Sequence, residues 1–132
     1  MRVKDIMSEE VITLEVDEEL SLADDIMQLG RIRHLPVVEN GKLVGIISQR
    51  DLFKSSLASV MGFGEKAKRD FLKTVAVKEV MVKKVITISP DADIKEAGRI
   101  MLEKKIGCLP VVGNDKLVGL ITETDILKQF IM

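Results

Sequence analysis

Aromatic residues are scarce in this chain, which holds four Phe among its 132 residues and no Tyr or Trp. A protein that binds single-stranded nucleic acid by stacking bases on aromatic side chains is therefore close to excluded. The charges also balance, with 20 Lys and Arg against 21 Asp and Glu, which argues against a protein that coats nucleic acid. We expect any flat ligand to lie between aliphatic side chains.

Cysteine, histidine and long apolar runs are equally sparse. One Cys and one His can form neither an intramolecular disulfide nor, by themselves, a zinc site. No apolar run reaches the roughly 18 residues that a membrane span needs, and charged residues stand within the first five positions. We therefore expect a cytoplasmic protein that is neither secreted nor inserted in a membrane.

The sequence repeats itself once. With a shift of 74 residues, positions 3–54 align with positions 77–128 without a gap, and 23 of the 52 pairs are identical. Two units this short cannot each enclose a large core, so we expect them to pack together with pseudo-twofold symmetry and to form two equivalent clefts. We assign residues 1–64 to the first repeat, 65–76 to a connector helix and 77–132 to the second repeat. The connector holds four basic residues, and a solvated linker explains them more simply than a binding patch.

Each unit has the pattern of a strand, a helix, two strands and a second helix. β-branched runs at 11–14 and 85–88 predict the first strand, and apolar residues at helical spacing predict the helix after it. Asn40 and Gly41, between two apolar runs, predict a hairpin. A last helix begins near Gln49 and ends before the glycines at 62–64. The predicted fold class is α+β, with two βαββα repeats.

The segments after the hairpins carry the most specific signal. They read Gly-Ile-Ile-Ser-Gln-Arg-Asp at 45–51 and Gly-Leu-Ile-Thr-Glu-Thr-Asp at 119–125. Combined with the duplicated Leu-Pro-Val-Val and Lys-Leu-Val-Gly segments, they resemble a pair of CBS domains, also called a Bateman module, over nearly the whole chain. The resemblance implies two inter-repeat clefts that bind adenosine-containing ligands such as AMP, ADP, ATP or S-adenosylmethionine, and a disc-shaped homodimer.

Two residues of each such segment suit a nucleotide. Ser48 and Thr122 lie where a strand gives way to a helix, so a hydroxyl and unpaired backbone N–H groups meet the positive end of the helix dipole, an environment for phosphate. Asp51 and Asp125 follow three residues later, and a carboxylate accepts both hydrogens of a ribose diol. The resemblance implies the same roles. The spacing is also that of a helix capping box, so both interpretations stand.

Other candidate residues would contact the base. The resemblance implies that Thr13 and Thr87, at the end of each first strand, line the adenine or ribose end of the cleft, although β-propensity alone explains a Thr in a strand. Four further residues offer aliphatic surface to a base, and core packing would explain them as well: Ile32, Pro36, Ile106 and Pro110.

The two repeats differ just before Leu-Pro. The first has Arg33 and His34 where the second has Gly107 and Cys108, and the resemblance implies a basic residue here that reaches phosphate. Arg50 adds a further cation to the first repeat only. We therefore predict a first site suited to a polyphosphate and a second site suited to AMP, adenosine or a less charged ligand.

No catalytic activity and no catalytic cofactor are expected, because the sequence lacks a Gly-x-Ser-x-Gly motif, a Walker loop, a metal-ligand cluster and an activated Cys–His pair. Two classes remain: an adenine-nucleotide sensor that signals to a separate, unidentified protein, and a ligand-free dimerisation or scaffold module. Apolar residues near the ends of both last helices indicate a homodimer, although packing within the chain explains them nearly as well. These residues are Val60, Met61, Ile126, Leu127, Phe130 and Ile131.

Overall fold

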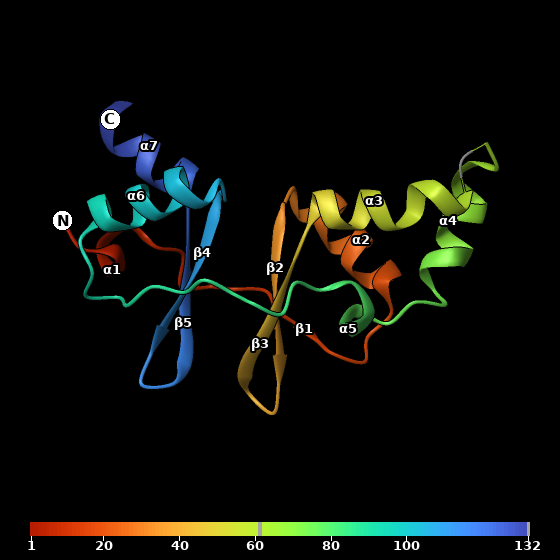
Figure 1. The fold of residues 1–132 in the computed structure, drawn as a ribbon, viewed down its shortest axis with the longest axis horizontal. Coiled ribbons are helices and arrows are strands. Elements are labelled where there is room, and N and C mark those ends of the chain that lie inside the picture. The colour runs from red at the N-terminus through yellow and green to blue at the C-terminus, as the bar shows by residue number, and fades with distance from the viewer. Residues whose placement is uncertain (61, 132) are drawn as a thin grey trace. The chain divides into compact units, whose positions relative to one another are not determined.

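The chain forms two compact units. The structure is a computed structural model that describes residues 1–60 and 62–131, the side chains of 56–60 excepted (Figure 1). The first-repeat unit is Ile12–Lys84, and the second-repeat unit joins Met1–Val11 to Val85–Met132. The predicted boundaries follow the sequence repeat, whereas in space each repeat gives its first segment to the other repeat's unit.

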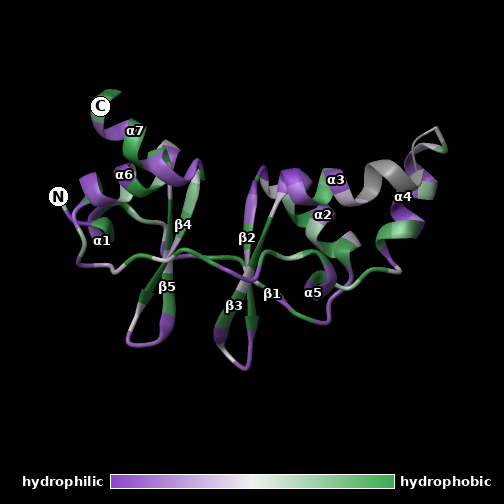
Figure 2. Ribbon diagram, viewed as in Figure 1, coloured by the Kyte–Doolittle hydropathy of each residue, from purple (hydrophilic) through white to green (hydrophobic). Residues whose placement is uncertain are grey.

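A three-stranded sheet with order β1-β2-β3 supports the first-repeat unit. Strand β1 (Leu14–Glu15) runs parallel to β2 (His34–Glu39), and β2 runs antiparallel to β3 (Lys42–Ser48). The predicted hairpin turn is confirmed, because Asn40 and Gly41 have φ of 53° and 80°, the positive values that a two-residue turn of this kind requires. The hydropathy colouring of Figure 2 changes from apolar strands to a polar turn at this point.

Helices pack on this sheet. The helices of the unit are α2 (Leu20–Gly30), α3 (Gln49–Val60), α4 (Gly64–Leu72) and α5 (Val77–Val80). Helix α2 buries an apolar stripe that includes Leu20, Ala23 and Met27, residues one helical turn apart that face the same side. Helix α4 lies in the segment assigned to the connector, although it ends at Leu72 rather than at 76, and it packs against α2 and α3.

The second-repeat unit repeats this plan around one hairpin. Its strands β4 (Cys108–Gly113) and β5 (Lys116–Thr122) are antiparallel. Its helices are α1 (Val3–Ile6), α6 (Ile94–Lys104) and α7 (Glu123–Ile131). The mixture of helices and strands confirms the predicted α+β class.

The first strands are shorter than predicted. In place of strands at 11–14 and 85–88, β1 covers only Leu14–Glu15, and its counterpart is a single bridge from Ile88 to Val111. Ile12 and Ile86 are exposed, and β-branched composition does not make a strand where no neighbouring strand pairs with it. Thr13 and Thr87 therefore precede the pairing residues, rather than ending a strand as predicted.

The opening segments of the two repeats are exchanged. Val3 is fully buried in the core of the second-repeat unit, and its equivalent Val77 is fully buried in the core of the first-repeat unit. Ser8 pairs with Leu120 through two hydrogen bonds of 2.9 Å, as Val82 pairs with Ile46 at 2.9 and 3.1 Å. Each hairpin thus gains an added backbone bridge.

Gly119 permits this close approach. A Cβ atom at position 119 would lie 2.5 Å from Sδ of Met7 and 2.9 Å from the carbonyl oxygen of Ser8. A Cβ atom at the equivalent Gly45 would likewise lie 2.5 Å from Sδ of Met81. The glycine of each Lys-Leu-Val-Gly segment is therefore required by packing of the exchanged segment.

Candidate functional site

The junction between β3 and α3 is closed by a capping box. The backbone N–H and the hydroxyl of Ser48 both donate to Oδ2 of Asp51, at 3.0 and 2.8 Å. In return, the N–H of Asp51 donates to the Ser48 hydroxyl oxygen at 3.1 Å. The capping interpretation of this spacing is therefore confirmed.

The junction between β5 and α7 has the same arrangement. Oδ2 of Asp125 accepts from the N–H and the hydroxyl of Thr122, at 2.9 and 3.1 Å, and the N–H of Asp125 donates to the Thr122 hydroxyl oxygen at 3.3 Å. Within the described residues no hydrogen bond reaches Oδ1 of Asp51 or Asp125. An ionised carboxylate has about four acceptor positions, so both carboxylates can cap the helix and also accept from a ligand.

The residues predicted to reach phosphate lie beside these junctions. His34 is the cross-strand neighbour of Ser48, and the carbonyl of Arg33 accepts from the N–H of Gln49 at 2.8 Å. Arg33 and Arg50 are exposed, and His34 is half-buried. The first-repeat unit therefore has two arginines, Arg33 and Arg50, next to its strand-to-helix junction.

The second-repeat unit presents no cation at the equivalent positions. Cys108 lies opposite Thr122, and it is buried. Burial first, and then the nearby negative charge of Asp125, raise the pKa of the Cys108 thiol to about 12. The thiol is therefore protonated at neutral pH, and it is unsuited to nucleophilic chemistry.

The predicted base-contacting residues are partly committed to the cores. Pro36 and Pro110 are buried, and Ile32 and Ile106 are half-buried against the two hydrophobic clusters, which supports the packing interpretation for all four.

Thr13 and Thr87 are exposed. Thr87 adjoins Ile88, whose N–H donates to the carbonyl of Pro110 at 3.1 Å. All predicted residues of one repeat thus fall within one compact unit.

Glu123 is a residue of this region that the sequence reasoning missed. A Cβ atom on Gly107 would lie 3.2 Å from Oε1 of Glu123, so the carboxylate of Glu123 lies against the Gly107 backbone. The available signal was the mismatch between the repeats, since the residue after Ser48 is Gln49 and the residue after Thr122 is Glu123.

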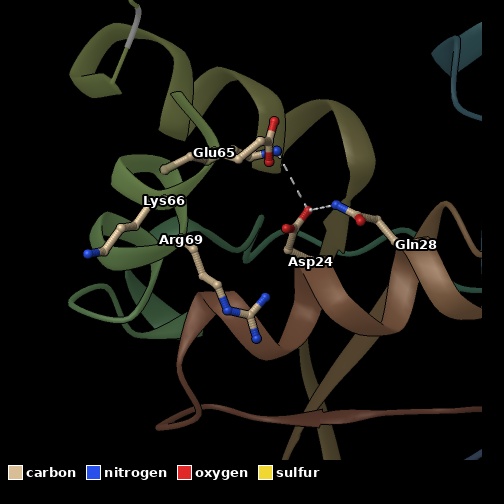
Figure 3. Close-up of a pocket in the computed structure, with 6 residues that line it drawn as sticks. Asp24, Gln28, Glu65, Lys66 and Arg69 are labelled. Atoms are coloured by element: carbon tan, nitrogen blue, oxygen red, sulfur yellow. Dashed lines mark hydrogen bonds and ion pairs between the residues drawn. The ribbon is translucent and has the colours of Figure 1, made fainter. Parts of the chain in front are cut away.

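A hollow of about 390 Å³ lies elsewhere, between α2 and α4 of the first-repeat unit (Figure 3). None of the predicted site residues lines it. The lining residues are Asp24, Gln28, Glu65, Lys66, Lys68 and Arg69.

Two of the three basic residues that line this hollow, Lys68 and Arg69, are paired with carboxylates. Arg69 donates to both carboxylate oxygens of Asp25 at 2.8 and 3.0 Å, and Nζ of Lys68 lies 3.9 Å from Asp24. The hydrogen bond from Arg69 is the main cause that lowers the pKa of Asp25. The partial neutralisation favours the solvated-linker interpretation of the connector.

The last helix leaves apolar side chains in solvent. Leu127, Phe130 and Ile131 are 58%, 82% and 75% exposed, whereas Ile126 packs against the core of its unit. Packing within this unit therefore explains only one of the four α7 residues that indicated a homodimer. The remaining two residues that indicated a homodimer are Val60 and Met61. The side chain of Val60 and the whole of Met61 lie outside the described part of the chain.

Two other features are absent from the described part of the chain. No group of three or more His, Cys, Asp or Glu side chains is arranged to hold a metal ion there. None of the described helices has both the length and the apolar character needed to cross a membrane.

Comparison with known proteins identifies relatives along the whole chain. An inosine-5'-monophosphate dehydrogenase of Methanocaldococcus jannaschii is 35% identical over 130 residues, which are 97% of this chain but 23% of the dehydrogenase. A CBS domain-containing protein of Dictyostelium discoideum is 30% identical over 131 residues and is covered to 90%. This chain therefore spans about a quarter of one relative and most of the other.

A solved structure gives a closer comparison of the fold. The CBS domain pair of protein MJ0100, in complex with 5'-methylthioadenosine and S-adenosylmethionine, superposes with a TM-score of 0.81 at 32% identity, covering 98% of this chain and 95% of that one. The family model of the CBS domain matches residues 3–58 and 77–131. The chain therefore belongs to the CBS domain family, of which it carries two copies.

Proposed function

We propose that this chain is a regulatory module that binds adenosine-containing ligands at the strand-to-helix junction of each repeat. The observation that carries the proposal is the duplicated arrangement of Ser48 with Asp51 and Thr122 with Asp125, in which each carboxylate uses Oδ2 for the cap. The MJ0100 pair, which binds 5'-methylthioadenosine and S-adenosylmethionine, is a relative with the same fold.

Each part of such a ligand has a chemical match. Oδ1 of Asp51 or Asp125 accepts from the ribose hydroxyls, while the 5' substituent lies near the start of α3 or α7, where the positive end of the helix dipole attracts negative charge. The base lies against aliphatic surface, in keeping with the lack of aromatics. The residues proposed for the base are Thr13, Ile32 and Pro36 in the first repeat and Thr87, Ile106 and Pro110 in the second.

The first repeat is proposed to take the more highly charged ligand. Arg33 and His34 lie beside its junction and Arg50 lies in the first turn of α3, and guanidinium groups bind phosphate oxygens in a bidentate manner. Gly107 and Cys108 stand in the second repeat instead, and offer no such donor. AMP, ADP or ATP therefore suits the first repeat, and a less charged adenosine derivative suits the second.

The output of the module is proposed to act through other chains rather than through catalysis. A ligand shifts a conformational equilibrium only when it binds one state better than another. The exposed Phe130 and Ile131 on α7 are proposed to join a second copy in a homodimer, and a separate regulated protein would respond to the bound ligand. The same exposed residues also favour the alternative, a dimerisation module that needs no ligand.

Thermal unfolding separates these functions. The midpoint is measured alone and with millimolar AMP, ATP, S-adenosylmethionine or 5'-methylthioadenosine. A ligand at 100 times its dissociation constant adds about 2.7 kcal/mol to the free energy of unfolding, so a bound ligand raises the midpoint measurably. An unchanged midpoint with all four ligands supports the ligand-free module.

A further inference from the structure

The two repeats differ in the charge at the start of their last helices. The first turn of α7 contains two acidic residues, Glu123 and Asp125, whereas that of α3 contains Asp51 alone. Gln49, which is neutral, occupies the position equivalent to Glu123. A helix N-terminus attracts an anion because it carries about half a positive charge, and in the second repeat two side-chain carboxylates already stand there.

The side chain of Glu123 is exposed, and its carboxylate lies against the backbone of Gly107. The backbone N–H of Glu123 donates to the carbonyl of Gly107 at 3.0 Å. The Oε1 and Cδ atoms of Glu123 lie 3.2 and 3.3 Å from the position that a Cβ atom of residue 107 would occupy. The absent side chain of Gly107 thus leaves the space into which Glu123 folds. In the first repeat, Arg33 has its side chain at the equivalent position.

The net charge near the two strand-to-helix junctions is therefore opposite in sign. Arg33, Arg50 and Asp51 sum to one positive charge in the first repeat, with His34 counted as neutral. Glu123 and Asp125 sum to two negative charges in the second, where Gly107, Cys108 and Thr124 contribute none. A 5'-phosphate that reached the start of α7 would meet a like charge directly.

We infer that Glu123 is a specificity-determining residue, which excludes 5'-phosphorylated ligands from the second repeat and admits adenosine derivatives whose 5' substituent is neutral or cationic. The inference rests on the proposed function, since it concerns which ligand the second junction takes. It names one side chain as the cause of the selectivity, and it makes the selectivity reversible by an uncharged substitution.

The test compares AMP with 5'-methylthioadenosine, which differ at the 5' position in charge. Ligand titrations are followed by NMR. The backbone amide signals of Gly107 and Thr122 report on the second repeat, and those of Arg33 and Ser48 report on the first. The variant E123Q keeps the shape of the side chain and removes its charge. Removal of a like charge that neighbours the phosphate in a solvent-exposed site predicts roughly a fivefold to tenfold gain in AMP affinity at the second repeat.

Three further results are expected. The affinity of the second repeat for 5'-methylthioadenosine changes less than about twofold in E123Q, because no charge faces Glu123 in that ligand. The matched variant Q49E lowers AMP affinity at the first repeat. Raising the salt concentration weakens the discrimination of the natural protein, because mobile ions screen exposed charges.

The outcomes separate the inference from the proposed function. An unchanged ratio of AMP to 5'-methylthioadenosine affinity at the second repeat of E123Q overturns the role of Glu123 while ligand binding stands. Absence of shifts at both repeats with both ligands overturns the proposed function and this inference with it. Dispersed amide spectra of E123Q and Q49E without ligand establish that each variant is folded.

Discussion

Replacing Asp125 by Ala separates the two roles of this carboxylate. In the ligand-free protein the change removes the acceptor of two hydrogen bonds, from the N–H and the hydroxyl of Thr122 at 2.9 and 3.1 Å. Loss of a helix cap of this kind costs about 1 to 2 kcal/mol. For a chain of this length we expect the unfolding midpoint to fall by about 4 to 8 °C.

The ligand response of the same variant measures the second role. With 5'-methylthioadenosine present at about 100 times its dissociation constant, binding at one site adds about 2.7 kcal/mol. In D125A the contribution of the second repeat disappears, because the acceptor for the ribose hydroxyls is gone. Differential scanning calorimetry with and without ligand records both effects on one sample.

Asp93 provides the matched control in the same unit. It caps α6 by accepting from the N–H of Lys95 at 2.8 Å, and no ligand role is proposed for it. D93A should lower the midpoint without ligand and keep the full ligand-induced rise. If D125A keeps that rise as fully as D93A does, Asp125 is a cap alone and the reasoning is refuted.

Three other perturbations test the structure itself. G119A should lower the free energy of unfolding, measured with urea, by an overpacking cost of about 1 to 3 kcal/mol, because its Cβ would meet the Ser8 carbonyl at 2.9 Å; an unchanged free energy contradicts this packing. The Cys108 thiol, with its pKa raised to about 12, should stay unmodified by a thiol reagent in native protein and react on unfolding, and prompt native reaction would count against its burial. The Arg69 guanidinium lowers the pKa of Asp25 below its ordinary 3.8. The ion pair of Arg69 with Asp25 therefore stabilises the fold above pH 3.8, and this stabilisation is lost as the pH falls through the lowered pKa of Asp25. R69M should therefore lose less stability on acidification than the natural protein, measured by urea unfolding across that range, and equal losses would contradict the pairing.

Local features of the fold were predictable from the sequence. The Asn40-Gly41 turn depends on residues that accept positive φ, and the capping box at Ser48 depends on two side chains three positions apart. Both are decided within a few residues of chain. The duplication supplied the rest of the plan, because each element of one repeat predicts its equivalent in the other.

Non-local features were not predictable in the same way. The pairing of Ser8 with Leu120 joins residues from the two repeats, and nothing in the local sequence of either segment predicts the other as its partner. The first strand was predicted too long because β-branched composition does not tell which residues find a neighbouring strand. The position of Glu123 over Gly107 is likewise a tertiary contact, visible in the sequence only as an acidic residue in a helical first turn.

Isothermal titration calorimetry with 5'-methylthioadenosine tests the central claim most directly. The natural protein is compared with the double variant Asp51→Ala and Asp125→Ala, whose folded state is checked by circular dichroism. We predict a saturable binding heat for the natural protein that is lost in the folded double variant. A natural protein without saturable heat at millimolar ligand, or a double variant that binds equally well, would contradict the claim that these two junctions bind adenosine-containing ligands.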